Sequence, residues 1–260
     1  MTLFLIASSS EGRLEGSDSV PIAAIPEYAL HARECALRFS GCEVAALSDM
    51  PGSGWYNYDY LIDDEWLPLW DGLAGAVKRW VIIEAYCRRH RVTTPIFSCD
   101  WDLLIFENLQ THFAKLKSNE YDFGHCVDRR YPEGLTSAPC LVNNHQCIKV
   151  YCQTVLAMCQ LAHPCKRIQW ADMSWWNRLR EYADSWKVFN AGQETDDAIL
   201  DPNINLDTDI YEDEDGRKKV VFVDKKPHFV RKQDRQHVNA VGVHCFMAYK
   251  ERTGELMSQS

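Results

Sequence analysis

Short hydrophobic runs alternate with amphipathic stretches along the first third of the chain. Residues 3–7, 42–47 and 95–99 are apolar runs of the length that buried strands have. Between these runs, residues 26–37 and 74–89 place apolar side chains at helical spacing. Because strands and helices follow one another in this order, the pattern predicts a mainly parallel sheet covered by helices.

Farther along the chain, residues 143–161 predict a helix that carries cysteines on its buried face. The charged residues 213–219 include an Asp-Gly step, which is typical of hairpin turns, and the apolar run 220–223 predicts a strand. We interpret the charge run as the solvated tip of a hairpin. Since the chain has no internal repeat and no low-complexity linker, we predict one domain over residues 1–250 and a frayed tail over residues 251–260.

Composition restricts the classes of protein to which the chain can belong. With 260 residues, 46% of them hydrophobic and 25% charged, the chain can bury a substantial core. The net charge of -9 argues against a broad surface for DNA or RNA, although it leaves room for a small basic pocket. The 11 cysteines form no C-x-x-C pair, which argues against a zinc site and against a disulfide framework.

The hydrophobic runs are too short for a membrane span. None of them reaches the roughly 20 apolar residues that a transmembrane helix needs. The first residues lack the positive charge and the long apolar core of a secretion signal, so we interpret them as the first strand. We therefore expect a cytoplasmic protein, with room for peripheral association with a membrane.

Two carboxylates, Asp100 and Asp102, directly follow the apolar run 95–99 and precede a second apolar run. In an extended segment, side chains two residues apart point the same way, so both carboxylates could face one point in a cleft. A hard divalent cation would remove their mutual repulsion and could keep open positions for the phosphate oxygens of a nucleotide-sugar diphosphate. The alternatives are solvated turn carboxylates, or a helix N-cap at Asp102.

Several segments resemble one family of enzymes in their order along the chain. The Arg-containing stretch 78–87 and the Asp-x-Asp segment 95–104 resemble the metal-dependent GT-A glycosyltransferases of bacteria and large viruses. Residues 170–174 are similar to the Asp-Met-Thr element of that group, residues 201–205 to its Asp-x-Asn-Ile segment, and residues 243–250 to its His-x-x-Gly-x-x-Lys element. The sequence departs from the pattern where Ser174 replaces Thr and where Met247 replaces Gly.

The resemblance implies a fold and a function. The fold would be α/β, a GT-A-like three-layer α/β/α domain with a mostly parallel central sheet and a C-terminal β-hairpin. The function would be transfer of a sugar from a nucleotide-diphosphate donor, a UDP- or GDP-sugar, to a glycan or lipid-linked acceptor. Two alternatives stay open, namely a catalytically silent nucleotide- or sugar-binding domain and a metal-dependent phosphohydrolase or nuclease.

The resemblance also implies roles for individual residues. Asp102 would coordinate Mn²⁺ or Mg²⁺ directly, Asp100 would hold the metal, its water or the nucleotide ribose, and His244 would complete the metal site. Lys250 would neutralise charge on the leaving diphosphate, and Arg79 would hold an aspartate carboxylate or contact the donor. Each residue also has an ordinary alternative. His244 could be a structural histidine, Lys250 could be a surface lysine, and Arg79 could form an ordinary salt bridge.

A third group of residues would lie near the acceptor. Asp172 would act as the general base of an inverting enzyme, or would simply cap the helix that follows it. The nearby Trp170, Trp175 and Trp176 could form a wall on which a sugar stacks, or could pack in the core. His125 could lie near the acceptor, although a lone histidine is more often structural.

Overall fold

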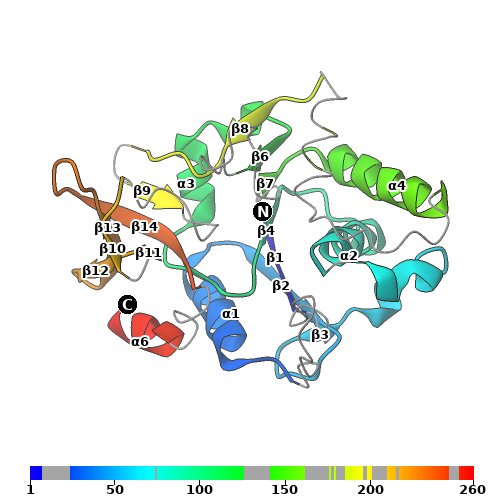
Figure 1. The fold of residues 1–260 in the computed structure, drawn as a ribbon, viewed down its shortest axis with the longest axis horizontal. Helices are drawn as coiled ribbons and strands as arrows, with labels where there is room; N and C mark the ends of the chain where they lie inside the picture. The colour runs from blue at the N-terminus through cyan, green and yellow to red at the C-terminus, as the bar shows by residue number, and fades with distance from the viewer. Residues whose placement is uncertain are drawn as a thin grey trace.

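The computed structural model describes residues 1–7, 24–73, 75–125, 141–161, 176, 179, 185–195, 198–200, 210–214, 217–245 and 252–260. These residues form a mixed α/β fold with two larger sheets, shown in Figure 1. The strands are β1 (Thr2–Ala7), β2 (Glu43–Ser48), β3 (Tyr56–Asn57), β4 (Ile96–Cys99), β5 (Leu103–Ile105), β6 (Phe123–His125), β7 (Leu141–Val142), β8 (Val188–Asn190), β9 (Ala198–Leu200), β10 (Asp213–Glu214), β11 (Arg217–Lys218), β12 (Val220–Val223), β13 (Lys226–Val230) and β14 (His237–His244). The helices are α1 (Glu27–Phe39), α2 (Gly75–His90), α3 (Leu109–Lys115), α4 (His145–Leu161) and α6 (Thr253–Gln259), with the 3₁₀ turns η1 (Asp59–Leu61), η2 (Leu67–Gly72) and η3 (Ser118–Glu120).

The larger sheet has the strand order β3-β2-β1-β4-β7-β6-β8. Strand β1 pairs in parallel with β2 and with β4, as the alternation of strands and helices predicts. Strand β7, however, runs antiparallel to both β4 and β6. The prediction of a mostly parallel sheet is therefore wrong, and the sheet is mixed. The alternating pattern ends at β4, and an antiparallel pair such as β6 and β7 needs no crossover helix.

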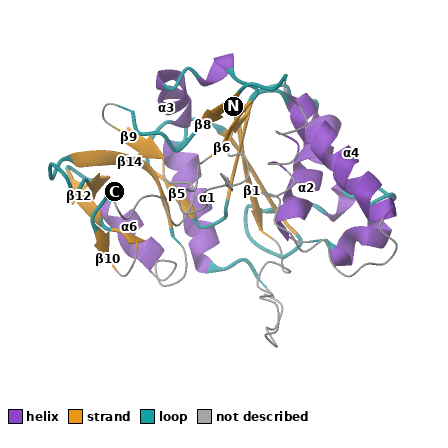
Figure 2. Cartoon of the chain, turned by 45° about the horizontal axis from the view of Figure 1, so that its top comes forward, coloured by secondary structure: helices purple, strands orange, loops and turns teal. Residues whose placement is uncertain are grey.

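Helices cover both faces of this sheet. On one face, α2 and α4 pack through a cluster that includes Trp80 and Tyr151 together with Phe4 of β1. On the other face lies α1, which is close to the first sheet through Ala29 and to the second sheet through other small residues of the same helix. Figure 2 shows the resulting order, with α2 and α4 on one side of the first sheet, α1 and α3 on the other, and the second sheet beyond α1.

The predicted helices are present with small shifts at their ends. Residues 26–37, 74–89 and 143–161 correspond to α1, α2 and α4.

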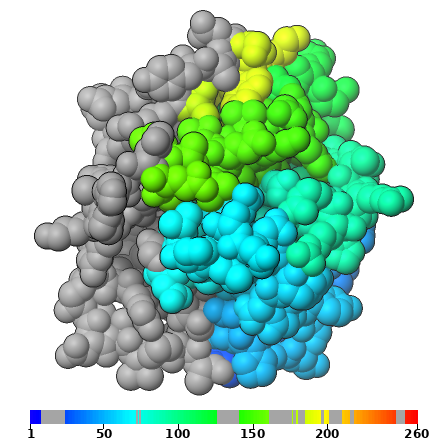
Figure 3. Space-filling view, turned by 90° about the vertical axis from the view of Figure 1, so that its right-hand side faces the viewer, coloured from blue at the N-terminus to red at the C-terminus, as the bar shows by residue number. Residues whose placement is uncertain are grey.

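Figure 3 shows the outer face of the molecule that α4 (green) shares with the cyan region around η2. Among the described residues, no helix has both the length and the apolar composition that crossing a membrane requires.

The second sheet has the order β12-β13-β14-β5, and β9 pairs with β14. Strands β12 and β13 form an antiparallel hairpin whose turn residues, Asp224 and Lys225, have positive φ angles of 49° and 64°. Strand β12 corresponds to the apolar run 220–223, which the sequence predicts as a strand. A two-residue turn with positive φ at both central residues has a backbone twist that matches the right-handed twist of the two strands. Strands β10 and β11 also pair in antiparallel fashion, as the Asp-Gly step between them predicts.

The C-terminal residues do not form the frayed tail that we expect from the sequence. They form helix α6, which contacts α1. Leu256 of α6 is 2% exposed, and a hydrogen bond of 2.8 Å joins Oγ1 of the buried Thr253 to Nδ1 of His31. The short helix is ordered because it covers apolar surface of α1 and the second sheet.

Candidate metal centre

Asp100 and Asp102 lie where the chain leaves the first sheet and enters the second. The backbone amide of Leu103 donates a 3.1 Å hydrogen bond to the carbonyl of Asp100, so the connection between β4 and β5 is a tight turn. Trp101, between the two aspartates, is buried and meets the ring of Tyr28 edge-on at 5.6 Å. The expectation of an extended segment at residues 100–102 is therefore wrong, because the chain turns here to change sheets.

His244 is the last residue of β14, and its side chain lies beside this turn. Strand β14 pairs with β5 in antiparallel register, with His244 opposite Leu103. The amide of Cys245 also donates a 2.8 Å hydrogen bond to the carbonyl of Asp102. The backbone therefore fixes the two side chains beside each other: Nε2 of His244 lies 2.8 Å from Oδ1 of Asp102 and 3.5 Å from Oδ2 of Asp100.

These three side chains form a group that could hold a metal ion. One ligand atom from each residue lies within 4.8 Å of the others, close to the separations around a single cation. Asp102 and His244 are buried, whereas the side chain of Asp100 is 41% exposed. Two carboxylate oxygens and one imidazole nitrogen suit a divalent cation, and the exposed side at Asp100 leaves access for a further ligand.

Arg79 of α2 supports the exposed carboxylate. Its guanidinium forms an ion pair with Asp100, and the arginine side chain is only 10% exposed. A buried guanidinium limits the rotamers that the carboxylate can adopt and partly neutralises its charge. Of the two roles that the sequence suggests for Arg79, contact with an aspartate is thus present, and contact with a donor stays a prediction.

The group also occupies a distinctive position in the first sheet. The chain runs from β1 to β2 on one side and later returns to β4 on the other side of β1. This reversal makes a topological switch point between β1 and β4, and Asp100 directly follows the carboxyl end of β4. In open α/β sheets, ligands bind in the crevice outside the carboxyl ends of the strands at such a point.

The structure places two other residues that the sequence singles out. His125 ends β6 and is 5% exposed. Because β6 is parallel to β4 through the antiparallel β7, His125 lies on the same edge of the sheet as Asp100. Trp176 is a core residue, with its ring stacked on Tyr151 at 4.8 Å, so the proposed sugar-stacking role of this tryptophan is wrong.

The remaining candidates lie outside the described residues. They are Asp172, Lys250, Trp170, Trp175, Ser174, Met247 and the segment 201–205. Sequence reasoning does not identify Tyr28 as a neighbour of the turn, because nothing in the pattern of α1 links its ring to Trp101.

No protein-family model matches this chain, and no curated protein matches it at a significant level. The features that bear on function are therefore the group Asp100, Asp102 and His244, its position at the edge of the first sheet and the order of the sequence motifs.

Proposed function

We propose that the protein is a metal-dependent glycosyltransferase that moves a sugar from a nucleotide-diphosphate donor, a UDP- or GDP-sugar, to a glycan or lipid-linked acceptor. The observation that supports this most directly is the convergence of Asp100, Asp102 and His244 at the carboxyl edge of the first sheet. A diphosphate is the natural ligand for such a place, because phosphate oxygens can complete the coordination of a cation held by few protein ligands.

The ligands favour Mn²⁺ or Mg²⁺. Carboxylate oxygens suit both ions, and the single imidazole nitrogen of His244 is more compatible with Mn²⁺. When bound, the ion would neutralise charge on the diphosphate and so help the nucleotide to leave. Zinc is less favoured because its catalytic sites typically use two or more nitrogen or sulfur ligands, and this group offers one imidazole among carboxylates.

The residues of the chain have separate tasks in this proposal. The buried Asp102 and His244 would hold the metal in a fixed place, since packing and backbone pairing restrict both. The exposed Asp100, held by Arg79, would face the incoming donor. Asp172 as the acceptor base and Lys250 at the diphosphate complete the proposal on the strength of the sequence resemblance.

The decisive experiment measures thermal stability with a panel of nucleotide-diphosphate sugars, each with and without Mn²⁺. A ligand that binds the native state raises the melting temperature by mass action. The proposal expects an increase that needs both the metal and one donor, and that is lost in Asp102→Asn. This variant keeps the side-chain shape and can still hydrogen-bond His244. Asp64→Asn, the same change at an exposed residue, serves as the control and should retain the effect.

Activity on the identified donor then separates the candidate functions. Sugar transfer, or slow donor hydrolysis without an acceptor, supports the glycosyltransferase. Metal-dependent donor binding with neither reaction would instead indicate a silent binding domain. Metal-dependent cleavage of simple phosphate esters, with no donor binding, would indicate a phosphohydrolase.

A further inference from the structure

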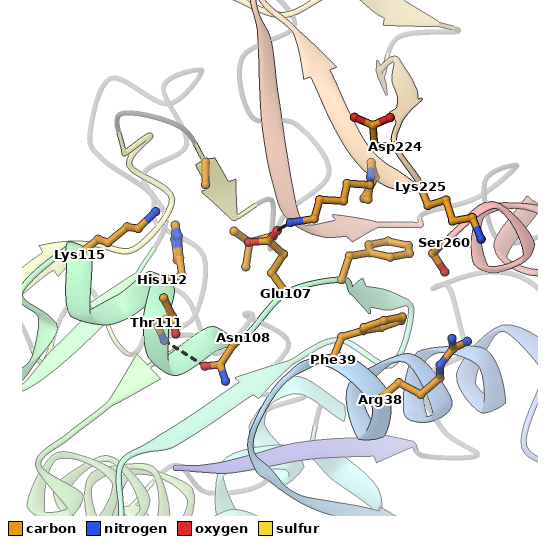
Figure 4. Close-up of a pocket in the computed structure, with 15 residues that line it drawn as sticks. Arg38, Phe39, Glu107, Asn108, Thr111, His112, Lys115, Asp224, Lys225 and Ser260 are labelled. Carbon is orange, nitrogen blue, oxygen red and sulfur yellow. Dashed lines mark hydrogen bonds and ion pairs between the residues drawn. The ribbon is translucent and has the colours of Figure 1, made fainter.

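A second candidate binding site lies at the other end of β5. A cavity of about 500 Å³ opens between the end of α1, the segment from Phe106 into α3, and the turn of the β12–β13 hairpin (Figure 4). Its lining shares no residue with the group Asp100, Asp102 and His244. The volume lies in the range of small-molecule sites.

The lining of this cavity is cationic although the chain as a whole is acidic. Four basic side chains and two acidic side chains line it, in a chain whose net charge is -9. One of the acids is already paired, because Nζ of Lys226 donates a 2.9 Å hydrogen bond to Oε1 of Glu107. The positive charge that the proposal uses therefore lies on Arg38 and Lys225, beside the exposed Asp224 and the chain end at Ser260.

The ion pair between Glu107 and Lys226 holds at neutral pH. Partial burial acts to raise the pKa of Glu107, but hydrogen bonds from Lys226 and Asn239, with the positive charges of Lys226 and Lys115, outweigh it and lower this pKa. The carboxylate thus stays ionised and keeps Lys226 in place. This pair accounts for the charge of Lys226, and the proposal uses the charges of Arg38 and Lys225.

Aromatic rings provide an apolar surface next to these charges. The rings of Phe39 and Phe106 lie 6.3 Å apart at 33°, and Phe222 meets Phe106 edge-on at 6.4 Å. The guanidinium of Arg38 lies 4.8 Å from the centre of the Phe39 ring. Figure 4 shows Arg38, from α1, and Lys225, from the hairpin turn, at the same end of the cavity, with Lys115 at the other end.

We propose that this cavity binds a small organic anion with an apolar or aromatic body and a carboxylate or phosphate group. The body would lie against Phe39 and Phe106, and the acid group would lie between Arg38 and Lys225. Charge attracts the acid group, and the rings favour a ligand that also has an apolar body. This site is independent of the proposed glycosyl transfer, since it uses neither the metal nor its ligands.

The test titrates the protein with 1-naphthyl phosphate and with 1-naphthoate, without added metal, by ligand-observed NMR. The proposal expects saturable binding of at least one of them, and much weaker binding of the neutral 1-naphthol. Which acid binds identifies the head group. Arg38→Gln and Lys225→Gln should each weaken binding by about tenfold, because each removes one charge-assisted contact. Both residues are exposed, so neither substitution should impair folding.

Two controls locate the probe. Lys219→Gln makes the same change at an exposed lysine outside the cavity and should leave the affinity unchanged. Asp102→Asn should also leave it unchanged, whereas loss of binding in that variant would place the probe at the metal centre. The proposal would be overturned by that result, by equal affinities in all variants, by equal binding of 1-naphthol, or by no binding of either acid.

Discussion

At the scale of single residues, the backbone determines that the side chains of His244 and Asp102 lie in contact. The two carboxylates are predictable as candidate ligands from their place after an apolar run, whereas His244 is implied only by the resemblance of residues 243–250 to the family element. Their contact depends on the pairing of β5 with β14, which joins positions far apart in the chain. A turn, and not the extended geometry expected at residues 100–102, brings the carboxylates together.

The imidazole of His244 should contribute directly to metal affinity. We expect His244→Gln to weaken Mn²⁺ binding by at least about tenfold, because an amide is a poorer ligand than imidazole. The concentration of unbound Mn²⁺, measured by electron paramagnetic resonance during a titration, gives the dissociation constant. His237→Gln, at an exposed histidine of the same strand, should bind as the unaltered protein does. Equal affinity in the two variants would remove His244 from the metal site.

Two arginines of α2 allow a matched comparison of ion pairs. Arg79 pairs with Asp100 and is almost buried, whereas Arg88 pairs with Asp63 and is 49% exposed. We expect Arg79→Met to lower the free energy of unfolding by about 1–3 kcal/mol, moderated by the exposure of Asp100. Arg88→Met should cost less than about 1 kcal/mol, because water and salt screen an exposed pair. Urea denaturation measures both, and equal costs would argue against a special role for Arg79.

At the scale of secondary structure, the sequence predicts elements that depend on local spacing better than elements that depend on long-range pairing. Helices α1, α2 and α4 follow from the spacing of their apolar residues, which is a local property. The direction of β7 and the change of sheet after β4 depend on which strands meet in three dimensions. Helix α6 is also missed, because its stability comes from contact with α1 and not from its seven residues alone.

Packing of α6 should make a measurable contribution to stability. Leu256→Ala removes a side chain that is 2% exposed, so we expect the free energy of unfolding to fall by about 2–4 kcal/mol. Gln259→Ala, at an exposed position of the same helix, should have little effect. Urea titration of the two variants measures the difference. A frayed C-terminus would instead make both substitutions neutral.

At the scale of the whole molecule, the buried cysteines link stability to alkaline pH. Burial raises the pKa of Cys35, Cys87 and Cys147 to about 12 from the ordinary 9.0. In the unfolded chain these thiols lose their protons above about pH 9, whereas in the folded protein they keep them. The folded state therefore binds more protons in this range, and the free energy of unfolding falls as pH rises from about 9 to 12.

The measurement is urea denaturation in a reducing buffer at several values between pH 8 and pH 10.5. Stability should decrease over this range, and Cys35→Ala should show a shallower decrease because one of the contributing thiols is gone. A curve that is flat above pH 9 would mean that these thiols ionise as easily in the folded protein as in the unfolded chain.

The contact between Asp102 and His244 also affects how the molecule holds together as a chain. The two residues are 142 positions apart, and Asp102 lies in the turn between the two sheets while His244 ends β14 of the second sheet. On the metal proposal, a bound cation links these two residues and can be removed. Closing a loop of this length costs the unfolded chain more conformational entropy than closing a short loop, so the link stabilises the folded state. Loss of the metal would then lower the free energy of unfolding, and a larger unfolded fraction would expose the chain to proteases, so metal supply would affect the lifetime of the protein as well as its chemistry.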